Sequence, residues 1–98
     1  MGKQTKITKS AREQDCLVRI PGVCNRNPET VIFAHKNGGG MGMKSPDIHG
    51  AYCCSSCHDA YDGRLETGWP PMELHLCFYE GIFRTQLSLV GQGLIETR

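Results

Sequence analysis

The sequence predicts a small α+β domain that is stabilised by a bound metal ion and ends in an amphipathic helix. Three observations predict this class. The chain has 98 residues, of which six are cysteines and only 39% are hydrophobic. β-Branched and aromatic residues gather in short runs such as residues 30–34, which is typical of strands. Apolar residues recur at steps of three and four from residue 72 to residue 90, which is typical of a helix with one apolar face.

The spacing of the cysteines indicates a structural zinc site. Cys54 and Cys57 are separated by two residues, which suits two ligands of a tetrahedral zinc ion, and Cys16 and Cys24 lie upstream to complete four ligands. Cys53 is an alternative to Cys54, and we prefer Cys54 because it gives the tighter interval. A structural zinc contributes roughly 10–16 kcal/mol of apparent folding free energy in small domains. Such an ion would offset the small hydrophobic core.

The N-terminal segment is polar and basic. It shows no apolar export signal, so we expect a cytoplasmic protein in which the cysteines bind metal rather than form disulfides. No run approaches the roughly 20 apolar residues of a membrane span. We expect residues 1–9 to form a flexible basic arm and residues 10–98 to form one domain. The cations that precede the first acidic residue are Lys3, Lys6, Lys9 and Arg12.

Local signals predict most of the remaining elements. Ser10 is expected to cap a helical turn that reaches Glu13, because the two residues stand at capping-box spacing. Residues 54–62 are expected to form a short helix that ends at Gly63. Short strands are predicted at residues 16–20, at residues 30–34, within residues 47–53, and at residues 94–95.

A long helix is predicted after Pro70 and Pro71, since proline is tolerated in the first turn. Its apolar stripe is expected either to cover the small core or to pair with a second copy of the chain, and Trp69 is expected to anchor the core. The stripe consists of Met72, Leu76, Tyr79, Phe83, Leu87 and Val90.

A second site is predicted around two histidines. His58 and Asp62 stand four residues apart and would share one face of the short helix. A nitrogen and a carboxylate suit a harder and more open metal site than the cysteines do. His35 follows the clearest strand and precedes the glycine-rich segment 38–42, as expected of a residue in a site that admits a polymer.

The order of strand, glycine-rich loop, strand and cysteine-bearing helix resembles the ββα-metal core of the HNH endonucleases. The resemblance rests on Ala34-His35, on the three glycines from Gly38, and on Cys54-Ser-Ser-Cys-His58. It implies that His35 is a general base for water and that His58 and Asp62 hold a catalytic Mg²⁺ or Mn²⁺ ion. It also implies that the paired cysteines bind structural zinc.

The chain is also similar to the YbcO-type nucleases of lambdoid phages and prophages over nearly all residues after residue 10. This resemblance implies a metal-dependent DNA endonuclease that acts in phage DNA recombination or processing, with DNA and recombination proteins as partners. The segments that carry it are Arg19-Ile-Pro-Gly-Val-Cys-Asn25, Pro28-Glu-Thr30, Ala34-His35, Pro46-Asp47, Cys54-Ser-Ser-Cys-His-Asp59 and Arg84-Thr-Gln86.

Ala34 departs from the HNH pattern, because many HNH enzymes carry a metal ligand immediately before the general base. Asp47 or His49 falls in a region from which it could orient the base or supply a ligand. The alternative function is therefore a non-catalytic zinc module that binds DNA or protein. Candidate DNA contacts, besides the basic arm, are Lys36, Lys44 and Arg64.

Overall fold

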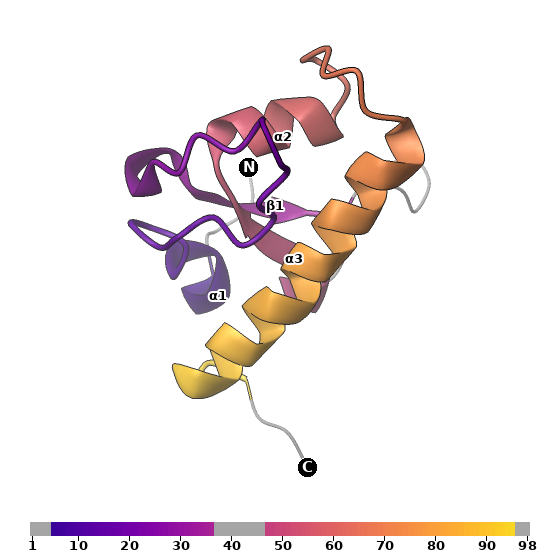
Figure 1. The fold of residues 1–98 in the computed structure, drawn as a ribbon. Helices are drawn as coiled ribbons and strands as arrows, with labels where there is room; N and C mark the ends of the chain where they lie inside the picture. The colour runs from indigo at the N-terminus through magenta and orange to yellow at the C-terminus, as the bar shows by residue number, and fades with distance from the viewer. Residues whose placement is uncertain (1–4, 37–46, 96–98) are drawn as a thin grey trace.

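The computed structural model describes residues 5–36 and 47–95 (Figure 1). It has a two-stranded sheet and three helices, which confirms the predicted small mixed architecture. The elements are α1 (Lys6–Lys9), β1 (Ile32–His35), β2 (Gly50–Cys53), α2 (Ser55–Tyr61) and α3 (Pro71–Gly91), with 3₁₀ turns at Pro28–Thr30 and Asp47–His49. Within the described ranges, no helix has the length and apolar content needed to cross a membrane.

The two strands form an antiparallel hairpin whose ends have different chemistry. At one end Ile32 pairs with Cys53, and at the other end His35 pairs with Gly50. All four residues of β2 are buried, whereas β1 has one exposed and one half-buried residue. The hairpin therefore leads directly into the cysteine-bearing segment at one end and carries a histidine at the other.

Helix α2 begins immediately after the sheet because Cys54 caps it. The Cys54 Sγ accepts a hydrogen bond from the Cys57 backbone N–H at 3.4 Å, and Cys54 itself keeps an extended backbone. Gly63, with φ +82°, follows the helix end and donates its N–H to the Ala60 carbonyl at 3.1 Å. This is the left-handed residue that the sequence predicts there.

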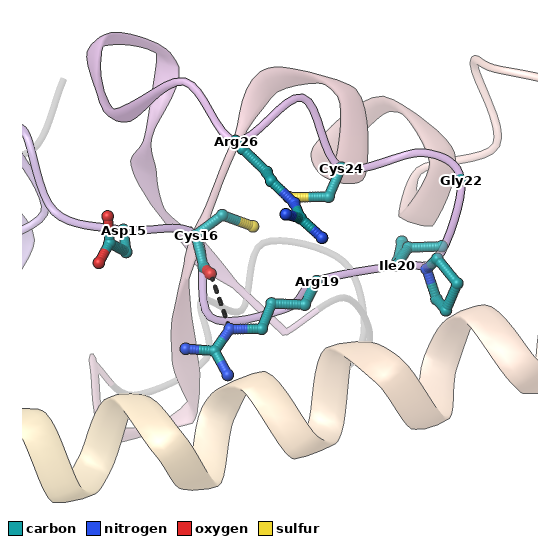
Figure 2. Close-up of a pocket in the computed structure, with 8 residues that line it drawn as sticks. Asp15, Cys16, Arg19, Ile20, Gly22, Cys24 and Arg26 are labelled. Atoms are coloured by element: carbon teal, nitrogen blue, oxygen red, sulfur yellow. Dashed lines mark hydrogen bonds between the residues drawn. The ribbon is translucent and has the colours of Figure 1, made fainter.

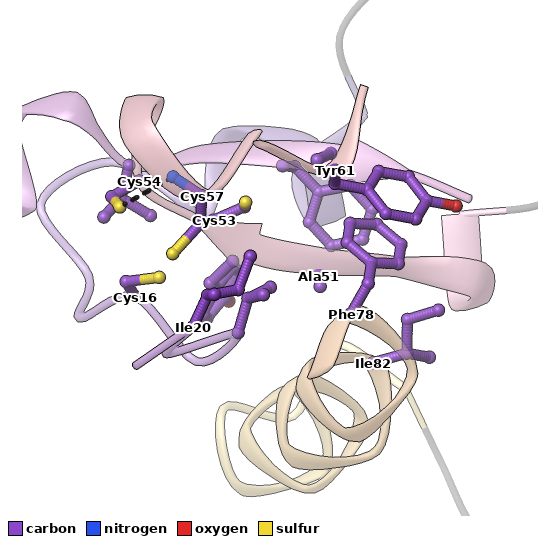
Figure 3. Close-up of a cluster of buried hydrophobic side chains, with 14 of the residues drawn as sticks. Cys16, Ile20, Ala51, Cys53, Cys54, Cys57, Tyr61, Phe78 and Ile82 are labelled. Atoms are coloured by element: carbon purple, nitrogen blue, oxygen red, sulfur yellow. Dashed lines mark hydrogen bonds between the residues drawn. The ribbon is translucent and has the colours of Figure 1, made fainter. Parts of the chain in front are cut away.

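Helix α3 crosses the sheet and covers β2 (Figure 1). The Tyr61 ring of α2 stacks on Phe78 with ring centroids 3.9 Å apart, and the Thr85 hydroxyl accepts a hydrogen bond from the Tyr52 backbone N–H at 3.0 Å. Figure 3 shows Phe78 and Ile82 reaching from α3 toward Ala51 and Tyr61. The face of α3 that packs inward consists of Leu74, Phe78, Gly81, Ile82, Thr85 and Leu89.

The predicted apolar stripe of this helix does not cover the core. Met72, Leu76, Phe83 and Leu87 are exposed by 75%, 51%, 66% and 75%. The helix carries apolar residues on two faces, and the face containing Phe78 and Gly81 is the one that fits against β2 and Val18. Of the two expectations for the stripe, the first is therefore wrong.

Several smaller predictions also differ from the structure. Residues 16–20 form no strand, because their backbone bends around the cysteines. Residues 94–95 form no strand either, since Leu94 lies in a bend where its N–H donates to the Leu89 carbonyl. The first helix is Lys6–Lys9, capped by Thr5, rather than a turn capped by Ser10. Trp69 is 42% exposed and donates its Nε1–H to the Pro21 carbonyl at 3.2 Å, so it ties the linker before α3 to the turn at Pro21 instead of filling the core.

Gly81 allows α3 to approach Val18 closely. A Cβ at this position would lie 2.7 Å from Val18 Cγ2 and 2.9 Å from Val18 Cα, and the second of these atoms belongs to the backbone. We expect Gly81→Ala to lower the free energy of unfolding by about 1–3 kcal/mol, because overpacking forces the backbone to shift. Denaturant unfolding followed by circular dichroism measures the effect.

Gly91→Ala is the matched control, since a Cβ there meets no atom within 4 Å. Alanine has the higher helix propensity, so this variant should match or exceed the wild type by up to about 1 kcal/mol. Equal stability of the two variants would contradict the close α3 contact.

Candidate metal centres and nuclease site

Four cysteines converge at the junction of β2 and α2. The sulfur atoms of Cys16, Cys24, Cys54 and Cys57 all lie within 4.8 Å of one another. The Cys24 and Cys54 sulfurs are 3.9 Å apart, close to the edge of about 3.8 Å that follows from a tetrahedron with Zn–S bonds of about 2.3 Å. This separation is about twice a disulfide bond length. The donor set therefore fits a tetrahedral metal ion such as zinc.

The first pair of cysteines is positioned by a turn that is tethered to the sheet. Gly22, with φ +74°, reverses the chain, and the N–H of Cys24 donates to the Ile20 carbonyl at 3.0 Å. The Leu17 N–H donates to the Tyr52 carbonyl at 2.8 Å, which fixes the segment of Cys16 against β2. The predicted turn after residue 20 is thus present, without the predicted strand.

Asn25 joins the two halves of the cysteine group. Its side-chain amide donates to the hydroxyls of Ser55 and Ser56 at 3.1 and 3.2 Å, and its Oδ1 accepts from the Asn27 N–H at 2.8 Å. The two serines between Cys54 and Cys57 therefore bind the other cysteine segment. No local pattern in the sequence predicts this role of Asn25, because only the fold brings it to residues 55 and 56.

The electrostatics of the group favour a cation at its centre. The pKa of Cys16 is lowered because Cys53 and Cys57 donate hydrogen bonds to its sulfur, and the pKa values of those two donors are raised by the same bonds and by burial. Burial raises the pKa of Cys24 to about 11. A divalent cation bound at the centre would favour the ionised form of its thiol ligands. Cys53 is fully buried and lies outside the group of four.

Two arginines line a cavity of about 430 Å³ beside Cys16 and Cys24 (Figure 2). Arg19 and Arg26 have φ values of 54° and 55°, and the Arg19 Nε–H donates to the Cys16 carbonyl at 3.3 Å. Four thiolates and one Zn²⁺ would carry a net charge of −2, and the cavity lining of Arg19, Arg26 and Asp15 carries a formal charge of +1 beside it. This partial compensation was missed at the level of sequence, where neither arginine has a distinctive spacing.

Helix α2 brings His58 and Asp62 together as predicted. The His58 Nε2 lies 3.3 Å from the Asp62 Oδ2, and the two side chains are 28% and 22% exposed. That separation suits adjacent ligands of an octahedral ion with bonds of about 2.1 Å. Arg64 also contacts the same carboxylate oxygen at 2.9 Å and reaches Asp59 at 3.3 Å. A metal ion bound by this pair would have to share Asp62 with Arg64 or displace it.

His35 occupies the last position of β1, with its ring edge-on to Phe33 at a centroid distance of 5.3 Å. The next residue, Lys36, donates its N–H to the His49 carbonyl at 2.9 Å. Lys36 and His49 line a groove of about 400 Å³ whose other wall is α3. The strand end therefore places His35 beside two of the other predicted polar residues.

The remaining residues that the sequence singles out near His35 add no ligand atom within the described part of the chain. Ala34 is buried in β1 opposite Ala51 and contributes no ligand atom. Asp47 opens the 3₁₀ turn before β2. The side chain of Asp47, Lys44 and the glycine-rich segment 38–42 lie outside the described residues.

Comparison with known proteins agrees with this architecture. The family model described as "Putative nuclease YbcO" matches residues 5–94. The chain belongs to the YbcO family. This family member is 41% identical over 96 residues to the "Putative nuclease YbcO" of Escherichia coli (strain K12) and to that of Enterobacteria phage 82. Each alignment covers 92% of the chain and 96% of the relative.

A solved structure is also similar to this YbcO family member. It is described as "Structure of a putative bacteriophage protein from Escherichia coli str. K-12 substr. MG1655". The TM-score is 0.78 at 41% sequence identity, and the match covers 89% of this chain and 99% of the solved one. The predicted resemblance to the YbcO-type proteins is thereby confirmed.

Replacing one of the four cysteines should release the metal. We expect metal-replete wild-type protein to contain about one equivalent of zinc, and Cys24→Ser to contain well under half, because oxygen replaces a thiolate ligand. Elemental analysis after dialysis, together with the thermal midpoint, measures both effects.

Cys77→Ser is the control, since Cys77 is a half-buried free thiol on α3 outside the group of four. It should retain the zinc content of the wild type. Zinc loss in both variants, or in neither, would count against the four-cysteine assignment.

Proposed function

We propose that this YbcO family member is a metal-dependent DNA endonuclease of the HNH type. The proposal rests on the order of the elements β1, β2 and α2. His35 ends the first strand, and the His58–Asp62 pair lies at the C-terminal part of the helix. The cysteine group anchors the start of that helix. Relatives named as nucleases at 41% identity support a nucleic-acid hydrolase.

His35 is the proposed general base. An imidazole accepts a proton near neutral pH, so it can activate a water molecule for attack on a phosphodiester. The ring is half-buried and its edge-on contact with Phe33 restricts its orientation. A fixed imidazole at the end of a strand is suited to in-line attack on a bound phosphate.

His58 and Asp62 are the residues that would hold Mg²⁺ or Mn²⁺. The ion would supply positive charge that stabilises the phosphate and the departing oxygen. Arg64 is 61% exposed and lies next to both side chains, so it is placed to bind a DNA phosphate beside them. Its present contacts with Asp59 and Asp62 hold the guanidinium in that position.

The remaining DNA contacts are proposed from charge. Lys36 lies next to His35, and the basic residues of α1 with Arg12 offer further phosphate contacts. Lys44 is a proposed contact from the sequence alone. The resemblance to nucleases of lambdoid phages and prophages is the basis for proposing a role in recombination or processing of phage DNA, with recombination proteins as partners.

A non-catalytic zinc module is the second candidate function. It is favoured by Ala34, which cannot bind metal, and by the Arg64 contact that already neutralises Asp62. Such a module would bind DNA through the same cations without cleaving it.

Removing the proposed base should abolish cleavage. With supercoiled plasmid and Mg²⁺ or Mn²⁺, wild-type protein should nick DNA, and His35→Ala should lower the rate at least about 100-fold, within the range that general bases contribute. Zinc content and thermal midpoint should stay those of the wild type, because His35 lies at the opposite end of the sheet from Cys53.

His75→Ala provides the matched histidine control. His75 is exposed on α3, where its ring centroid lies 5.2 Å from that of Tyr61, and it has no proposed catalytic role. Nicking should persist in this variant. Wild-type protein that binds DNA but cleaves none with any divalent cation would support the zinc module instead.

A further inference from the structure

The outward face of α3 carries an apolar surface that no described part of the chain covers. The α3 stripe, defined as Met72, Leu76, Tyr79, Phe83, Leu87 and Val90, repeats every 3.6 residues and so runs straight along the helix. It spans about 27 Å at 1.5 Å per residue. Four of its six side chains are exposed by half or more. Monomers rarely leave large contiguous apolar surfaces in water.

The order of residues in the stripe is nearly symmetric about its middle. The two aromatic residues, Tyr79 and Phe83, lie on either side of residue 81, and Leu76 and Leu87 lie five to six residues from it. Met72 and Val90 are nine residues away on each side. A two-fold axis at this point would therefore place aromatic residues against aromatic residues and aliphatic ends against aliphatic ends.

We propose that a second copy of this chain covers the α3 stripe, with the two α3 helices antiparallel across a two-fold axis that passes between Tyr79 and Phe83, at the level of residue 81 along the helix. In such an isologous contact Leu76 of one copy meets Leu87 of the other, and the reverse contact forms as well. The partner is a copy of the same chain because the stripe is complementary to itself.

The charges beside the stripe agree with this arrangement. Glu80 and Arg84 lie on one flank, 65% and 39% exposed, with 3.9 Å between their charged atoms. Antiparallel packing about residue 81 brings the same flank of both helices together. Glu80 of each copy then lies near Arg84 of the other, so two pairs of opposite charges form along this edge of the contact.

The opposite flank widens the contact. Gln86 donates its Nε2–H to the Ile48 carbonyl at 2.6 Å, which holds the 45% exposed Ile48 side chain beside the helix. The groove of about 400 Å³ opens at Tyr79 and Phe83 and can receive an aromatic ring of the partner. Ile48 and the groove therefore add contact area to the helix face, toward the roughly 800 Å² that each partner buries in a stable interface.

The dimer would also bring two candidate sites together. Lys36 and His49 form the far wall of the groove, and His35 directly precedes Lys36. Because the groove opens at the middle of α3, both His35 strand ends would lie toward the two-fold axis. This consequence rests on the proposed nuclease function, and it predicts that one dimer can cut two strands.

Sedimentation equilibrium of the zinc-loaded full chain tests the contact. We expect the wild type to have twice the mass of one chain at about 1–100 μM, and Leu87→Glu to raise the dissociation constant at least about tenfold because it places a charge in an apolar contact. Leu65→Glu, at a 42% exposed leucine in the turn after α2, should remain dimeric. All three proteins should share one thermal midpoint under conditions in which they are monomeric.

A cross-link tests the orientation. In a Cys77→Ser background, an equal mixture of Leu76→Cys and Leu87→Cys proteins should form an intermolecular disulfide at least about tenfold faster than either protein alone. Monomeric wild-type protein, or efficient cross-linking of either variant alone, would overturn the proposal. A dimer that cleaves no DNA would support this contact and contradict the nuclease function. A monomer that nicks DNA would contradict this contact and support the nuclease function.

Discussion

Two segments that are 30 residues apart in the chain contribute sulfur atoms to a group whose members all lie within 4.8 Å of one another. That convergence decides where α2 begins, because Cys54 caps the helix with the same sulfur that faces Cys24. With so short a sheet, hydrophobic burial alone gives little control over the angle at which α2 leaves β2. The sulfur group and the Asn25 hydrogen bonds to Ser55 and Ser56 fix that junction, and with it the position of His58.

The other side of the sheet depends on the close approach of α3. Gly81 leaves room for Val18, and Thr85 satisfies the buried N–H of Tyr52 that no neighbouring strand can reach. The segment containing Cys16 is thereby held between the helix and the sheet. Arg84 adds a hydrogen bond to the Leu17 carbonyl at 2.8 Å. The helix and the cysteine group thus stabilise the same segment from two directions.

The sequence predicted those features that depend on neighbouring residues. The Cys54-x-x-Cys57 spacing, the His58–Asp62 pair and the glycine that ends α2 are set by helix geometry. Which face of α3 packs inward was not predictable, because both faces are apolar and the choice depends on how Gly81 meets Val18. The role of Asn25 was equally hidden, since it arises from a contact between segments that are 30 residues apart in the chain.

We propose that one zinc ion, held by Cys16, Cys24, Cys54 and Cys57, fixes the helix that carries the candidate nuclease residues. Zinc-edge X-ray absorption of the purified protein identifies the ligand atoms of that ion. Four sulfur ligands at about 2.3 Å, with no nitrogen or oxygen in the first shell, are the expected result. A mixed shell of sulfur and nitrogen would contradict the claim, because His58 would then be a ligand of the structural ion and not free for a second metal.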